Sequence, residues 1–138
     1  MPHRILIWHY LSFPASEAAE MQAQVMTVKQ ARWIECRAGV ESLDQALELV
    51  ALCAEHDAPC VLLAEEALPP AFFDLSSRFA GEFIQKLVNY RLAVAGMFAD
   101  SAAYGERFGE YLNEARQGRQ FRVFDGREAA LAWLAAQH

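Results

Sequence analysis

The chain has 138 residues, 54% of them hydrophobic and 22% charged, and its 18 acidic and 12 basic side chains give a formal net charge of -6. A chain of this length has room for one domain with a sizeable core. The acidic balance argues against a nucleic-acid-binding protein, because phosphate contacts need a concentrated basic face. The seven glycines and five prolines form no repetitive tract, which excludes collagen-like and low-complexity proteins.

The amino-terminal residues 1–24 differ in composition from the rest of the chain. Residues 4–13 form an apolar decamer, and residues 14–24 form a connector rich in Ala and Glu. The decamer is shorter than the roughly 20 residues that a membrane-spanning helix needs, and no clean signal-peptidase site follows it. We expect a cytoplasmic protein without membrane contact, with residues 1–24 as an extension or extra strand plus a connector and residues 25–138 as one α/β domain. Residues 1–20 are expected to be dispensable for folding.

Three cysteines, Cys36, Cys53 and Cys60, make an odd count without a C-x-x-C pair. This usage favours free thiols in a reducing compartment over a disulfide framework. The spacing Cys53-x-x-His56-x-x-x-Cys60 is the one arrangement with metal-ligand character, but a tetrahedral site would need a fourth ligand. We therefore expect no metal and no other cofactor.

The first half of the chain alternates between strand and helix patterns. Two runs of β-formers, residues 25–28 and 33–36, predict strands joined by a tight turn. A capping-box pattern from Ser42 to Gln45 precedes apolar residues at helical spacing up to Ala54. The continuous apolar run at residues 60–64 predicts a strand that is covered on both sides.

The second half begins with two prolines that suit the entry to a long helix. An apolar stripe at helical spacing predicts this helix, namely Phe72, Leu75, Phe79, Phe83 and Leu87. Side chains of alternating charge stand four residues apart along it, forming a ladder of Asp74, Arg78, Glu82 and Lys86. A strand at residues 92–98, a helix capped by Ser101 and ended by Gly118, a strand at residues 121–124 and a helix capped at residues 125–128 complete the pattern.

The order of these elements predicts the fold class. Strands that alternate with helices pair in parallel through right-handed crossovers. We expect a small single α/β domain with a central, mostly parallel sheet and about four flanking helices. Loops at the carboxyl ends of the strands are the usual functional edge of such sheets, here residues 65–77 and 99–101.

Motifs for dinucleotide, P-loop, serine hydrolase and zincin chemistry do not occur in the sequence. No histidine falls near the two loops to act as a base at neutral pH. The sequence therefore leans against an enzyme.

One segment carries a family resemblance. Residues 72–91 read FFDLSSRFAGEFIQKLVNYR, and this string is similar to the signature of a small bacterial family known as domain of unknown function 4180. The resemblance runs from about Val25 to the carboxyl end. It identifies a family without implying an activity.

A second resemblance concerns architecture. An apolar strand, a loop ending in Asp-x-Ser-Ser, a helix and a further strand resemble the anti-sigma-factor antagonist (STAS) fold. In that fold a Ser or Thr at the start of this helix is phosphorylated by a partner kinase, and the surrounding surface docks the partner. The resemblance carries over to Asp74, Ser76 and Ser77, although Leu75 separates Asp from Ser and Arg78 replaces a glycine of the antagonist pattern. It implies a kinase or an anti-sigma-type regulator as partner.

Two functions fit these observations. The first is a non-enzymatic regulatory module that binds another protein, or a second copy of itself as a homodimer, through Asp74, Ser76 and Ser77 with Glu65 and Glu66 nearby. The alternative is a small-molecule binding or catalytic domain that uses Glu65, Glu66, Asp74 and Ser77 in a pocket. An exposed apolar patch of Pro70, Phe72 and Phe73 would favour the first function, and a closed acidic pocket would favour the second. In the simplest interpretation, Asp74 or Ser76 only caps a helix.

Overall fold

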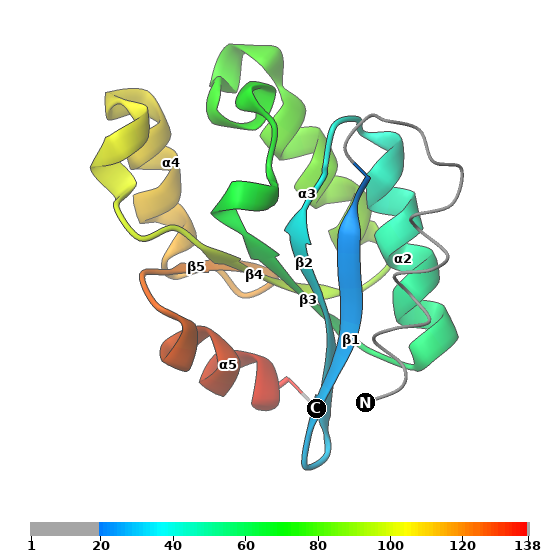
Figure 1. Ribbon diagram of the computed structural model, residues 1–138. Helices are drawn as coiled ribbons and strands as arrows, with labels where there is room; N and C mark the ends of the chain where they lie inside the picture. The colour runs from blue at the N-terminus through cyan, green and yellow to red at the C-terminus, as the bar shows by residue number, and fades with distance from the viewer. Residues whose placement is uncertain (1–19, 138) are drawn as a thin grey trace.

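A five-stranded sheet forms the middle layer of the computed structural model, which describes residues 20–137 (Figure 1). The strands stand side by side in chain order: β1 (Gln22–Val28), β2 (Ala31–Ala38), β3 (Cys60–Ala64), β4 (Ala93–Met97) and β5 (Phe121–Phe124). The β1–β2 pair is antiparallel and the other pairs are parallel. The predicted fold class, a small α/β domain with a mostly parallel sheet, is confirmed.

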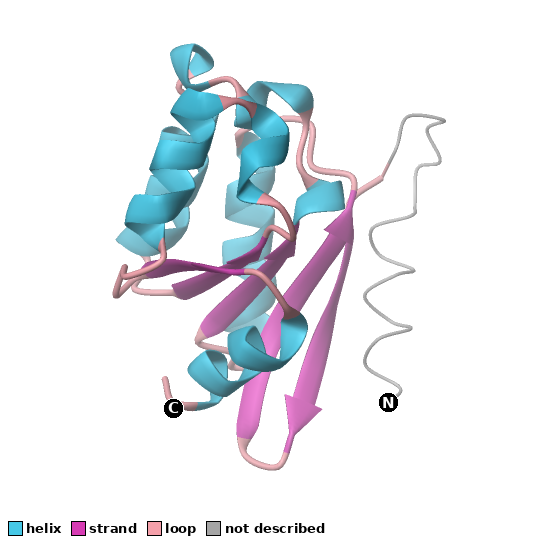
Figure 2. Cartoon of the chain, turned by 90° about the vertical axis from the view of Figure 1, so that its left-hand side faces the viewer, coloured by secondary structure: helices cyan, strands magenta, loops and turns pink. Residues whose placement is uncertain are grey.

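Helices cover the two faces of the sheet unequally (Figure 2). One face carries α2 (Asp44–His56), α3 (Phe79–Asn89) and α4 (Glu106–Ala115), which bury the larger core cluster. Each of these helices connects two neighbouring parallel strands, and right-handed crossovers in one direction place them on the same face. The other face carries α5 (Arg127–Ala135) over a smaller cluster. Among the described residues, no helix has the length and apolar character that a membrane span requires.

The beginning of the described chain is already part of the sheet. β1 starts at Gln22 rather than at Val25, so the end of the expected connector is strand. The apolar decamer at residues 4–13 lies outside the described residues. The tight turn between β1 and β2 is confirmed, and Lys29 adopts a left-handed φ of 57° in it.

The capping box at the start of α2 is only half formed. The Gln45 side chain accepts a hydrogen bond from the Ser42 backbone N–H at 2.8 Å, as predicted. The reciprocal bond is missing, because Leu43 occupies the N-cap and no side chain caps it. Gln45 also donates to the Gly39 carbonyl at 2.9 Å, which holds the loop before the helix.

The predicted long helix after Pro70 is wrong. One short 3-10 helix, η1 (Glu65–Ala67), precedes the prolines. Two more, η2 (Pro70–Phe73) and η3 (Leu75–Ser77), replace the first half of the predicted helix. Arg78 then takes a left-handed φ of 66°, and α3 begins only at Phe79. The side chains of Asp74 and Ser77 bond to nearby backbone groups, which competes with a continuous helix. The predicted ladder is broken, and its four described members form no ion pairs with each other.

The helix predicted from Ser101 is also divided. A 3-10 helix, η4 (Ser101–Tyr104), precedes α4, and Gly105 separates the two with a φ of 93°. Asp100 rather than Ser101 supplies the cap, because its carboxylate accepts from the Ala102 N–H at 3.0 Å. Similarly, α5 begins after Gly126 without a side-chain cap.

Candidate functional site

The loops that follow β3 and β4 meet at the carboxyl edge of the sheet. One carboxylate oxygen of Glu65 accepts a hydrogen bond from the Ala99 N–H at 2.8 Å. The other oxygen accepts from the Tyr104 hydroxyl. Burial and the Glu65 carboxylate together raise the pKa of Tyr104 to about 12, so its phenol remains a donor at neutral pH. Glu65 therefore joins the two loops that the sequence singled out.

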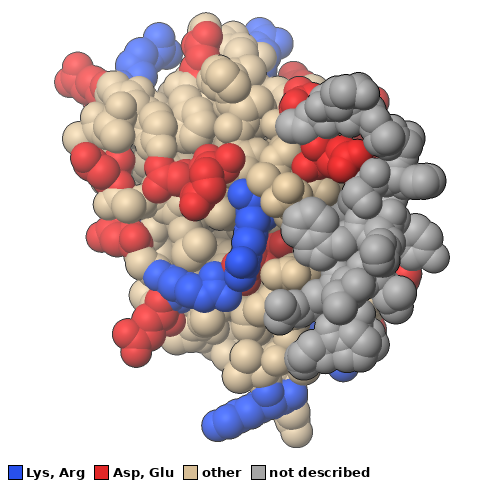
Figure 3. Space-filling model, viewed as in Figure 1, with Lys and Arg blue, Asp and Glu red and all other residues tan. Residues whose placement is uncertain are grey.

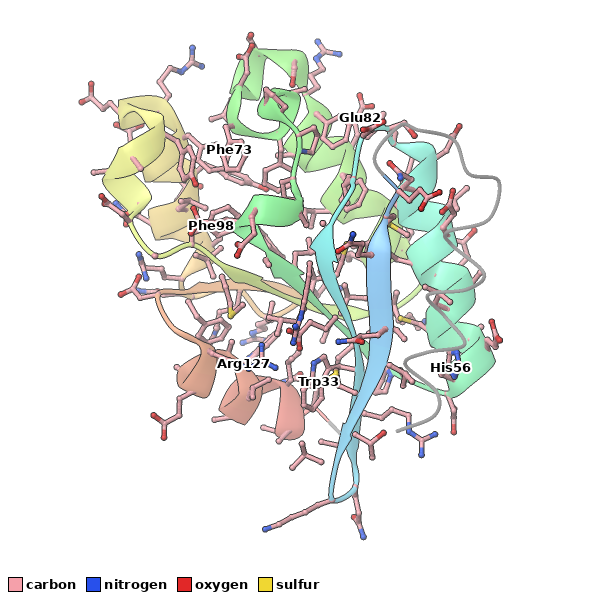
Figure 4. All side chains as sticks on the ribbon, viewed as in Figure 1. Trp33, His56, Phe73, Glu82, Phe98 and Arg127 are labelled. Carbon is pink, nitrogen blue, oxygen red and sulfur yellow. The ribbon has the colours of Figure 1, made fainter. Side chains whose placement is uncertain are left out.

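A cluster of aromatic rings supports this edge. Tyr104 stacks on Phe73 with a centroid distance of 4.1 Å, and the cluster continues through Phe72, Phe98 and Phe108. In Figure 4, Phe73 and Phe98 lie between α4 and the segment that leads into α3. Phe72 is fully buried and Phe73 is half-buried. The structure therefore does not form the exposed patch of Pro70, Phe72 and Phe73 that would favour protein docking, because the rings pack on each other.

A pocket of about 310 Å³ lies next to this cluster. One wall comes from η2 and η3, and the other from the end of η4 and the start of α4. Its lining residues are Phe73, Asp74, Leu75, Ser76, Tyr104, Gly105, Glu106, Arg107 and Phe108. The structure thus brings two of the five predicted site residues, Asp74 and Ser76, into one pocket, whereas Glu65, Glu66 and Ser77 do not line it.

Asp74 and Ser76 are bonded to each other at the rim of the pocket. One Asp74 oxygen accepts from the Ser76 N–H at 3.1 Å and from the Ser76 hydroxyl at 2.7 Å. Asp74 thereby caps η3, a 3-10 helix rather than the predicted long helix. Both side chains remain exposed, so a partner or a modifying enzyme can reach the Ser76 hydroxyl.

Ser77 has a different environment from Ser76. Its hydroxyl lies 2.6 Å from the Ala71 carbonyl and 2.7 Å from the Asp74 carbonyl, either of which can accept its single proton. The same oxygen accepts from the Phe79 N–H at 3.1 Å. Ser77 therefore holds η2, η3 and the first turn of α3 together.

This difference predicts different effects of alanine at the two serines. Ser77→Ala should lower the free energy of unfolding by about 1 kcal/mol, since it removes a hydroxyl that bonds to the backbone of Ala71, Asp74 and Phe79. Ser76→Ala should stay within about 0.5 kcal/mol of the wild type, as at other exposed positions. Urea denaturation followed by circular dichroism measures both values. Equal losses for the two variants would contradict the structural role assigned to Ser77.

Acidic side chains dominate the electrostatics around the pocket. The charges of Glu65, Glu66 and Asp100 all contribute to the raised pKa of Tyr104. Glu66 itself is exposed, and Glu106 lines the pocket from the first turn of α4. Acidic side chains gather on this part of the surface (Figure 3). The edge therefore attracts basic rather than acidic groups.

A buried carboxylate on the face of the sheet that α5 covers was not predicted from the sequence. Glu35 is 1% exposed and accepts from Trp33 Nε1 at 3.1 Å and from Arg37 Nε at 3.0 Å. Both terminal nitrogens of Arg127 also bond to it, at 2.7 and 2.8 Å, and Figure 4 shows Arg127 and Trp33 between α5 and β2. Alternation along β2 places Trp33, Glu35 and Arg37 on one face, which is a signal that the sequence contains. Arg127 is distant in sequence, so no local pattern indicates its contact with Glu35.

The surroundings of Glu35 make it a structural group. Burial alone would raise the pKa of Glu35, but hydrogen bonds from Arg127 and Trp33 and the charges of Arg127 and Arg37 outweigh burial and lower the pKa. A carboxylate with this many donors is a stable anion and a poor general base. Its function is to attach the start of α5 to the sheet.

The three cysteines are buried free thiols. Burial raises the pKa of Cys36 and Cys53 to about 12 and that of Cys60 to about 11, so the reactive thiolate is scarce at neutral pH. Cys53 and Cys60 belong to core clusters on opposite faces of the sheet. Within residues 20–137, no group of His, Cys, Asp and Glu is arranged to hold a metal ion.

Comparison with known proteins gives one match. The family model described as domain of unknown function (DUF4180) matches residues 23–134. Neither a curated protein nor a solved structure matches the chain. Because the family model spans most of the sequence, including β2 to β5, all but the first residue of β1, and the pocket, the chain belongs to the family of domain of unknown function 4180.

Proposed function

We propose that the chain is a cytoplasmic regulatory module that binds another protein at the pocket between η3 and the start of α4. The observation that carries this proposal is the joining of Asp74 and Ser76 with the first turn of α4 in one solvent-accessible pocket. Three buried free thiols support a reducing compartment. Loops at the carboxyl ends of parallel strands are where such sheets usually bind ligands.

The chemistry of the pocket favours a basic side chain from the partner. Its apolar part includes Phe73 and Leu75, and the carboxylates of Asp74 and Glu106 lie at its rim, with Arg107 as the one cation that lines it. A Lys or Arg can lay its aliphatic stem on apolar surface and keep its charge next to the carboxylates. The net charge of -6 also favours approach of a basic partner. A kinase or an anti-sigma-type regulator is the partner class that the antagonist resemblance implies.

Ser76 is the residue through which this docking would be regulated. Its hydroxyl is exposed beside Asp74, and a phosphate there adds close to two negative charges at pH 7. The added charge would strengthen attraction for a basic group in the pocket. Ser77 is less suited to modification, because its hydroxyl already joins three segments of backbone.

The alternative, a small-molecule or catalytic pocket, has less support from the geometry. It requires Glu65, Glu66, Asp74 and Ser77 to act together, whereas only Asp74 of these four lines the pocket. Glu65 is bonded to Ala99 and Tyr104. Docking by charge needs only the groups at the rim, so it is the function that we retain.

Two substitutions of opposite sign test the proposal. Asp74→Asn removes one negative charge but keeps a good capping residue, and Ser76→Asp adds one. Wild type, both variants and the distant control Glu48→Gln serve as baits in a lysate of the source organism, and captured proteins are quantified by mass spectrometry. We expect one partner to be lost with Asp74→Asn and enriched with Ser76→Asp, with no change for Glu48→Gln. Equal capture by all four baits, or capture of nothing, would overturn the proposal.

A further inference from the structure

The amino edge of the parallel strands carries features that the carboxyl edge does not use. The β1–β2 turn protrudes there beyond α2 and α5 (Figures 1 and 2). Hollows of about 640 and 590 Å³ lie on its two sides. Val28 and Tyr90, which line these hollows, are 53% and 56% exposed. A protruding turn, adjacent hollows and exposed apolar side chains together are typical of a contact surface.

The larger hollow is formed beside the turn by the end of α2 and the segment before β4. Its apolar lining includes Val50, Pro59, Leu92 and the ring of Tyr90. Asp57, the residue that ends α2, also lines it. The Asp57 carboxylate therefore stands next to the apolar lining of this hollow.

The turn carries the complementary charge. Lys29 is exposed at its tip. Within the part of the chain that the structure describes, neither Lys29 nor Asp57 takes part in an ion pair. Arg32 also lines the hollow. Its guanidinium donates a hydrogen bond to the His56 carbonyl at 3.0 Å, so it is bound to the last residue of α2. A lysine on the projecting turn and, in the adjacent hollow, a carboxylate without an ion pair among the described residues therefore lie on one surface.

We propose that two copies of the chain associate through this edge, with the turn of each copy seated in the larger hollow of the other. A twofold interface requires a self-complementary surface, in which each residue meets its counterpart twice. The turn and the hollow meet this condition, because Lys29 of each copy reaches Asp57 of the other. The contact would also cover Val28 and Tyr90. It leaves the carboxyl edge and its pocket open, so it is independent of the proposed docking site.

Charge reversal tests the contact in the full chain by sedimentation velocity at a series of protein concentrations. Lys29→Glu and Asp57→Lys each place like charges opposite each other twice, and each should weaken dimerisation at least about tenfold. Mixing the two variants should restore the wild-type affinity in mixed dimers, because both contacts then join opposite charges. Residues 29 and 57 both have a left-handed φ, of 57° and 55°. A lysine at residue 57 would therefore adopt a backbone conformation that Lys29 already has.

The control is Arg78→Glu at the opposite edge, which should leave the dimer unchanged, since Arg78 is exposed and has a left-handed φ of 66° like Lys29. Circular dichroism and urea midpoints confirm that each variant is folded, and if Asp57→Lys alone is unstable, Asp57→Asn combined with Lys29→Glu gives a second measure of the coupling. A wild-type monomer at all concentrations up to roughly 1 mM, or a dimer that neither reversal weakens, would overturn the proposal.

Discussion

Truncation of Phe83 to alanine should lower the free energy of unfolding by about 3 to 5 kcal/mol, as for other buried phenylalanines. Phe83 is fully buried in the larger core cluster, where its ring stacks on Phe79 with a centroid distance of 5.7 Å. The truncated side chain leaves a cavity that surrounding residues fill only partly. Urea denaturation at pH 7 measures the loss.

Gln85→Ala on the same helix provides the control. Gln85 is exposed and bonds only to the Asn89 side chain in the described structure, so its loss should stay within about 0.5 kcal/mol. A Phe83→Ala variant with an unchanged denaturant midpoint would mean that α3 does not pack on the sheet as described.

Removal of the Arg127 guanidinium should cost about 1.5 to 3 kcal/mol, the range for hydrogen bonds to a charged group, because Glu35 is buried whereas the Arg127 side chain is 42% exposed. Arg127→Ala leaves Glu35 buried, although Arg37 and Trp33 still donate to it. The double variant Glu35→Ala with Arg127→Ala should lose less than the sum of the single losses, because no uncompensated charge remains. Strictly additive losses would contradict a direct coupling of the two side chains.

The Glu35 contribution also has a defined pH dependence. Its pKa is lowered in the folded chain, so the stabilisation is complete above the ordinary glutamate pKa of about 4.3 and is lost as the pH falls through the folded-state value. The stability difference between wild type and Arg127→Ala should therefore shrink in acid. A difference that grows below pH 4 would contradict the assignment.

The sheet was predictable from the sequence because its strands have local signals. The apolar run at residues 60–64 and the strand at residues 121–124 appear with the predicted bounds. Helix starts were less predictable, since Asp74, Ser77 and Asp100 satisfy backbone groups in short 3-10 turns while the apolar spacing continues through them. The spacing of apolar residues indicates which side chains are buried, not whether the backbone is α-helical. Phe72 is buried although it precedes the start of α3.

The candidate site was predictable only in part for a similar reason. Asp74 and Ser76 could be predicted as site residues because they lie between a predicted strand and the start of a predicted helix. Tyr104 and Glu106 reach the same pocket only through tertiary packing, which no local pattern indicates. Glu65 was predicted as a pocket acid, and its bonds to Ala99 and Tyr104 depend on how neighbouring strands end. The Glu35–Arg127 pair likewise joins residues distant in sequence, which no local pattern indicates.

In the proposed function, the pocket between η3 and α4 receives a basic side chain. Titration of the ¹⁵N-labelled chain with a short peptide of lysine and arginine, followed by amide chemical shifts, tests it without a known partner. We expect saturable shifts at residues 73–76 and 104–108 that are lost in Asp74→Asn and retained in Glu48→Gln. Shifts spread over all acidic surfaces without saturation, or none at the pocket, would contradict it.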